Sequence, residues 1–130
     1  MRNFAKVALS LSAALMVVGM MDTPEANART QYQKQMGKIY PDLLKKHGTG
    51  KEGAKKFSCK VCHPGKTKKK RNDFGVALTK AMGKKNQKDE AKIKEAFEKV
   101  AKEKSGKDKA KTYGELIKDG KLPGSEKEAN

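Results

Sequence analysis

Apolar residues recur at helical spacing through most of the chain beyond residue 29, and two-residue alternation is rare. The stretch from residue 30 to residue 46 predicts a helix divided by Pro41. Proline suits the first turn of a helix, so a second short helix is expected over 42–46. The apolar face of the first part consists of Tyr32, Met36, Ile39 and Tyr40.

Further helices are predicted beyond a linker marked by three glycines between residues 48 and 53. One is expected over 54–62, ending where Pro64 and Gly65 stop it. Another begins after Asn72, a residue suited to capping, and ends before Gly83. Residues expected on the inner faces of this and the later helices are Phe74, Ala77, Leu78, Ala81, Ala91, Ile93, Ala96, Phe97, Val100, Ala101, Tyr113, Leu116 and Ile117.

The last two predicted helices have their own end signals. Asp89 and Glu90 open the first, which is expected to reach Gly106. Thr112 and Glu115 have the spacing of a capping box and open a short helix. No longer strand pattern and no internal repeat are present, so we predict an all-α fold of four to five short helices. The polar tail after Pro123 is expected to be loose.

The first residues follow a different pattern. Arg2 and Lys6 precede an uncharged apolar run from Val7 to Met21, and Ala26-Asn27-Ala28 offers small residues for cleavage. This layout predicts a secretory signal peptide over residues 1–28, removed near Ala28. The run of 15 residues is shorter than the roughly 20 that a membrane span needs. We therefore expect an exported, periplasmic domain over 29–130 with no transmembrane segment.

Composition adds two constraints. The chain carries 31 Lys and Arg against 15 Asp and Glu, a formal net charge of +16, and the charges before residue 29 cancel. Such a protein attracts anionic partners, of which nucleic acid is the least natural after export. The chain has no Trp and only 5% aromatic residues. A domain this small therefore needs an additional source of buried apolar surface to be stable. A large apolar cofactor would supply it, whereas a Cys59–Cys62 disulfide closes too short a loop.

The run Cys59-Lys60-Val61-Cys62-His63 is the C-x-x-C-H sequence to which c-type haem is attached. Two thiols at this spacing can reach the two vinyl groups on one porphyrin edge, and His63 then lies under the iron as a neutral imidazole ligand. A disulfide, a thioredoxin-like redox pair and a zinc site are the alternatives. The redox pair lacks a preceding strand, and zinc lacks ligands because His47 is the only other histidine.

With this motif, a signal peptide and about 100 mature residues (130 minus 28), the chain resembles the small soluble mono-haem c-type cytochromes. The resemblance implies a helical fold around one covalent haem c and one-electron transfer, with no enzymatic activity. Two features depart from the usual members of that family. About 30 residues precede the motif (59 minus 29), and the only later methionine, Met82, follows His63 by 19 residues.

The distal haem ligand has three natural candidates in the mature chain. Met82 ends the helix that begins after Asn72, Met36 lies on an apolar helix face, and His47 is the second imidazole. Met82 is the preferred candidate, while Met36, His47, a lysine and an open iron site remain alternatives. A Met/His pair would raise the reduction potential, whereas an open site would bind small ligands.

A basic loop directly follows the motif. It places a positive surface near the expected haem edge, which would steer acidic redox proteins or a membrane-bound redox complex toward a monomeric carrier. Alternative functions are a five-coordinate haem protein, a haem subunit of a larger complex, and a basic binding protein without cofactor. The loop residues predicted to dock a partner are Lys66, Lys68, Lys69, Lys70 and Arg71.

Overall fold

The structure is a computed structural model that describes residues 24–83 and 86–129. In those residues the chain forms α-helices and one 3-10 turn, with isolated bridges but no strand, which confirms the all-α class. The predicted n-region and apolar run of the signal peptide lie outside the described residues. The elements are α1 (Pro24–Ile39), α2 (Pro41–His47), η1 (Cys59–Val61), α3 (Asp73–Met82), α4 (Glu90–Ala101) and α5 (Tyr113–Lys118).

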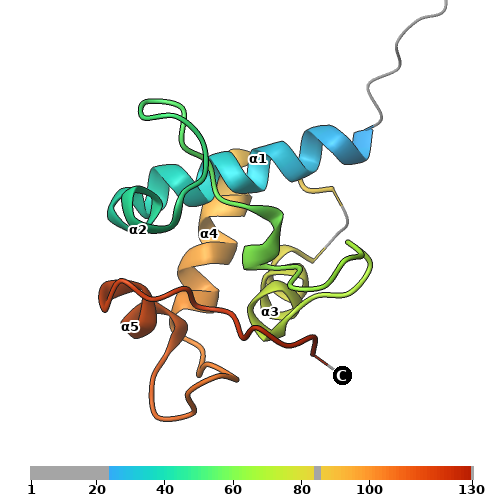
Figure 1. Ribbon diagram of the computed structural model, residues 1–130. Helices are drawn as coiled ribbons and strands as arrows, with labels where there is room; N and C mark the ends of the chain where they lie inside the picture. Colours follow the sequence, from blue (N-terminus) through green and yellow to red (C-terminus); the bar gives the residue numbers. More distant parts are fainter. Residues whose placement is uncertain (1–23, 84–85, 130) are drawn as a thin grey trace, which may run out of the picture.

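Helix α4 is the centre of the packing, since it contacts α1, α3 and α5 (Figure 1). Its buried side chains are Ile93, Ala96, Phe97 and Val100, as the helical spacing predicts. Ala91 was expected to face inward but is exposed. Two residues turn a helix by about 200°, so Ala91 lies opposite Ile93.

Three buried phenylalanines and a tyrosine form the middle of the core. Phe74 of α3 lies between Phe97 of α4 and Tyr113 of α5, with ring centroids 6.3 and 5.2 Å away. Phe57 comes from the segment before η1 and is 1% exposed. Residues from the cysteine segment and from three helices therefore share one core.

The predicted helix ends are largely confirmed. The Asn72 side chain accepts a hydrogen bond from the N–H of Gly75, and α3 ends at Gly83 in the left-handed region at φ 69°. Asp89 caps α4. Thr112 and Glu115 form the predicted capping box at the start of α5. Local polar side chains thus set three of the helix starts.

Two predicted helix extents are wrong. Residues 54–62 are not a helix: Thr49 and Lys56 form an antiparallel bridge, which pulls this segment into a loop, and only Cys59–Val61 turns as 3-10. Helix α4 ends at Ala101 rather than Gly106, because Lys104 then bridges to Thr112. In both cases a pairing across a loop replaces helical hydrogen bonds.

The tail after Pro123 is packed, although its polar sequence predicts a loose segment. Pro123 and Gly124 are buried. The Ser125 N–H donates to the Asp73 carboxylate at 2.7 Å, and the Ala129 N–H donates to the Arg71 carbonyl at 2.9 Å. The tail therefore returns to the start of α3 and to the basic loop. Within the described residues, no helix has the length and apolar character to cross a membrane.

Candidate cofactor site

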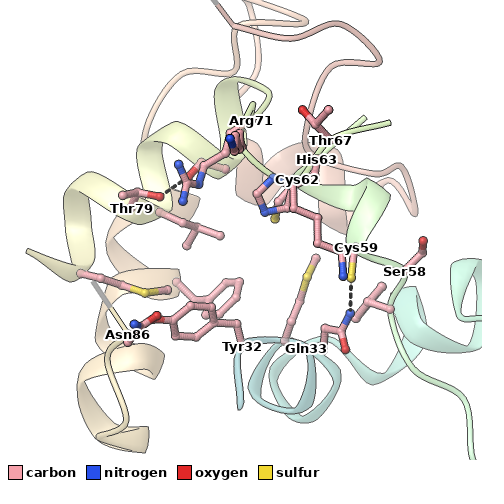
Figure 2. A pocket seen from close by; sticks show the side chains of 18 of the residues that line it. Tyr32, Gln33, Ser58, Cys59, Cys62, His63, Thr67, Arg71, Thr79 and Asn86 are labelled. Atoms are coloured by element: carbon pink, nitrogen blue, oxygen red, sulfur yellow. Dashed lines mark hydrogen bonds between the residues drawn. The ribbon is translucent and has the colours of Figure 1, made fainter. Parts of the chain in front are cut away.

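A cavity of about 790 Å³ lies between α1, the cysteine segment, α3 and α4 (Figure 2). This volume is within the roughly 300–1,000 Å³ typical of cofactor and ligand sites. Cys59, Cys62 and His63 all line it. Its apolar lining consists of Met36, Phe57, Leu78, Met82 and Phe97.

The two cysteines are held by the short η1 turn. Ser58 caps the turn by accepting from the Lys60 N–H, and the N–H groups of Cys62 and His63 donate to the Cys59 carbonyl at 3.2 and 2.9 Å. The two thiols are not joined in a disulfide. Cys59 and Cys62 thus line the same cavity as two free thiols.

The environments of the two thiols differ. Gln33 of α1 donates from Nε2 to the Cys59 sulfur at 3.1 Å (Figure 2). The pKa of the Cys62 thiol is raised to about 12, mainly by burial and to a smaller extent by the neighbouring Cys59. Cys62 is therefore a protonated, partly buried thiol at neutral pH.

The imidazole of His63 is oriented by a backbone carbonyl. Its Nδ1 lies 2.8 Å from the Lys70 carbonyl oxygen. A carbonyl only accepts, so Nδ1 carries the proton, and in the neutral imidazole Nε2 then keeps its lone pair. This tautomer is the one that binds a metal through Nε2, and such a second hydrogen bond commonly orients histidine ligands.

Asn72 closes the loop that carries this carbonyl. Its backbone N–H donates to the Cys62 carbonyl at 2.9 Å, and its side-chain Nδ2 donates to the Val61 carbonyl at 2.8 Å. The side chain is almost fully buried. Helix α3 packs closely behind the motif, since a Cβ on Gly75 would lie 2.8 Å from the Cys62 carbonyl oxygen. The start of α3 thereby fixes both ends of the loop.

The structure places the three candidate distal ligands differently relative to the cavity. Met82 and Met36 both line the cavity, from the end of α3 and from α1. His47 does not belong to this lining, and its Nε2 lies 2.9 Å from the Gly120 carbonyl oxygen. The structure thus brings both methionines, but not His47, into the site that contains His63.

The cationic side chains of the basic loop also fall into two groups. Four of its five cations line the cavity and are exposed, whereas the Lys70 ammonium pairs with Glu128 of the tail at 2.9 Å. Lys70 therefore contributes its carbonyl to His63 and its charge to the tail. The four cations at the cavity are Lys66, Lys68, Lys69 and Arg71.

Several functional contacts are not readable from the sequence. Tyr32 and Gln33 precede Met36 on α1 and line the cavity, but nothing local indicates that α1 lies against the cysteines. The sequence marks Asn72 only as a helix cap. The role of the Lys70 carbonyl has no side-chain signature, because any residue at that position supplies the same oxygen.

Neither a further metal-binding cluster among the described residues nor a similar protein assists the interpretation of the cavity. Within residues 24–83 and 86–129, no group of three or more His, Cys, Asp and Glu residues is arranged to hold a metal ion. Comparison of the chain with protein-family models, curated proteins and solved structures gives no match.

Proposed function

We propose that this chain is an exported c-type cytochrome that carries one covalent haem and transfers single electrons. The observation that carries the proposal is the cavity with both thiols and the His63 imidazole along it, where the Nδ1–H bond leaves Nε2 free for iron. The apolar lining suits a porphyrin. Bound haem would supply an iron that alternates between its ferric and ferrous states.

Cys59 and Cys62 would hold the cofactor through two thioether bonds. Each thiol would add across one vinyl group, with the sulfur bonding one vinyl carbon and the thiol hydrogen going to the other. This addition would consume no oxidant or reductant. The unpaired state of both thiols supports this chemistry.

The far side of the cavity suits the haem propionates. Figure 2 shows Thr79 and Asn86 across the cavity from Cys59, and Arg71 also lines it. The propionates lie on the porphyrin edge away from the vinyl groups. We therefore assign Arg71 as the cation that offsets their charge and Asn86 as a hydrogen-bond donor to them.

The distal ligand proposed here is a methionine, with Met82 as the initial choice and Met36 as the alternative. Both line the cavity, and a Met/His pair suits a carrier with a raised potential. The exposed Lys66, Lys68 and Lys69 would dock an acidic redox partner near the haem. No catalytic step is assigned to the chain.

The deciding experiment is production of the full chain in a bacterial host that attaches haem c. Covalent haem is expected to remain with the polypeptide after denaturation and acidic solvent extraction, with a c-type haemochrome spectrum and recovery in the periplasmic fraction. The Cys59→Ala and Cys62→Ala double variant is the matched control and should lose the haem. A colourless wild-type protein, or haem that extracts freely, contradicts the proposal. Ready carbon monoxide binding by the ferrous wild type would contradict the six-coordinate carrier.

A further inference from the structure

The loop between the motif and α3 has little support of its own. Its six residues from Lys66 to Arg71 are all exposed. Yet this loop carries the Lys70 carbonyl, which accepts the Nδ1–H of His63 at 2.8 Å. Asn72 holds the two ends of the loop, and the position of that oxygen between them depends further on what restrains the loop from outside.

The C-terminal tail supplies that restraint. Glu128 pairs with the Lys70 ammonium at 2.9 Å, and the Ala129 N–H donates to the Arg71 carbonyl at 2.9 Å. The Glu128 carboxylate also lies against Gly65, where an added Cβ would collide with it. The tail thus contacts the loop near its beginning and at its end.

The tail is itself anchored to the folded core. The Ser125 N–H donates to the Asp73 carboxylate, and its carbonyl accepts from Asn72 Nδ2 at 3.0 Å. Farther along, the Ser125 hydroxyl donates to the Lys127 carbonyl at 2.8 Å, which bends the tail just before Glu128. An anchored segment can transmit a restraint, whereas a free terminus cannot.

From these contacts we propose that the C-terminal tail is a clamp on the loop, and that Glu128 is a positioning residue for the haem ligand His63. It acts through the Lys70 backbone and touches neither haem nor His63. A firm Nδ1–H bond to the Lys70 carbonyl makes the imidazole a stronger donor to iron and favours the ferric state. Release of the clamp weakens that bond, so the midpoint potential rises. This inference rests on the proposed haem function.

The test uses two doubly substituted holoproteins of unchanged net charge. Lys70→Gln with Glu128→Gln removes the contact between tail and loop. Lys127→Gln with Glu126→Gln removes one exposed charge of each sign from the tail alone. Neither residue lines the cavity, and neither has an ion pair among the described residues. Since all four side chains are exposed, both variants should fold. Net charge is matched, so a bulk electrostatic change cannot explain a difference between them.

We expect the midpoint potential to shift upward in the Lys70/Glu128 variant and to stay near wild type in the Lys127/Glu126 variant. Amide exchange of residues 66–71 should also accelerate only in the first. If the potential of the Lys70/Glu128 variant stays at the wild-type value, or shifts no further than that of the control variant, the clamp is overturned and the cytochrome proposal stays intact. A wild-type protein without covalent haem overturns both.

Discussion

A single backbone oxygen, the Lys70 carbonyl, sets the tautomer of the His63 imidazole. Because Lys70 accepts from Nδ1, the lone pair on Nε2 is available without any change of tautomer. The distal ligand of the proposed haem is less constrained, because Met36 and Met82 line the same cavity and either could hold that position.

Substitution of the two methionines separates these alternatives. If Met82 is the distal ligand, Met82→Ala should abolish the sulfur-to-iron charge-transfer band, lower the midpoint potential and let the ferrous protein bind carbon monoxide. Met36→Ala should keep that band and lose stability by about 2–5 kcal/mol, because Met36 is a buried core residue. The reverse pattern assigns Met36 instead. Retention of the band in both single variants contradicts methionine ligation from either side chain alone.

At the scale of the elements, Asp73 links three parts of the chain around the start of α3. Its carboxylate accepts from the Ser125 N–H at 2.7 Å, from the Gly106 N–H at 2.9 Å and from the Tyr113 hydroxyl at 3.0 Å. Partial burial acts to raise the pKa of Asp73, but the hydrogen bonds from Ser125 and Tyr113 outweigh it and the pKa is lowered. The ionised carboxylate thus connects α3, α5 and the tail.

Asp73→Asn should reduce the free energy of unfolding by about 1–3 kcal/mol at neutral pH, since hydrogen bonds to a charged group are lost. The folded pKa lies below the unfolded value of 3.8, so this contribution is complete above that value and disappears as the pH falls through the folded pKa. Denaturant unfolding at neutral and acidic pH measures it. The two proteins should therefore converge in acid.

Two variants serve as controls for that measurement. Tyr113→Phe removes one of the three donors and should cost less than Asp73→Asn. Glu95→Gln, at an exposed site of α4, should stay within about 0.5 kcal/mol of wild type. A loss in Asp73→Asn that is independent of pH would show that the lowered pKa has no part in stability.

The elements also show which features the sequence can predict. Helices with their own caps, such as α3 with Asn72 and α5 with Thr112, follow from a few neighbouring residues. The expected helix over 54–62 fails because Thr49, outside that window, pairs with Lys56. Contact between Gln33 and Cys59 joins positions 26 residues apart, so no local pattern encodes it. Motif chemistry is local, whereas the cavity around it is made by long-range packing.

Over the whole molecule, positive charge is widespread, but the two lysine-rich regions differ in position. The loop after the motif places Lys66, Lys68 and Lys69 at the cavity. The exposed lysines of α4 and its C-terminal end are not among the residues that line it. Of these two sets, only the first lies where a partner could approach the proposed haem closely. The two regions should therefore contribute differently to the proposed electron transfer.

A matched pair of triple variants tests this difference. Substitution of Lys66, Lys68 and Lys69 by Gln should slow bimolecular electron transfer to an acidic redox protein by about 10-fold or more at low ionic strength, because electrostatic steering of that size is typical of charged sites. It should also flatten the dependence of the rate on salt. The control replaces Lys92, Lys99 and Lys102 of the α4 region by Gln and removes the same net charge.

Stopped-flow reduction of the partner at several ionic strengths measures both effects. At high salt the two variants and the wild type should converge, because screening suppresses the steering while the distance from haem to partner is unchanged. Equal slowing in the two variants would mean that net charge, rather than the loop beside the cavity, controls the encounter. A loop variant that remains slow at high salt would instead point to a direct contact made by these lysines in the docked complex.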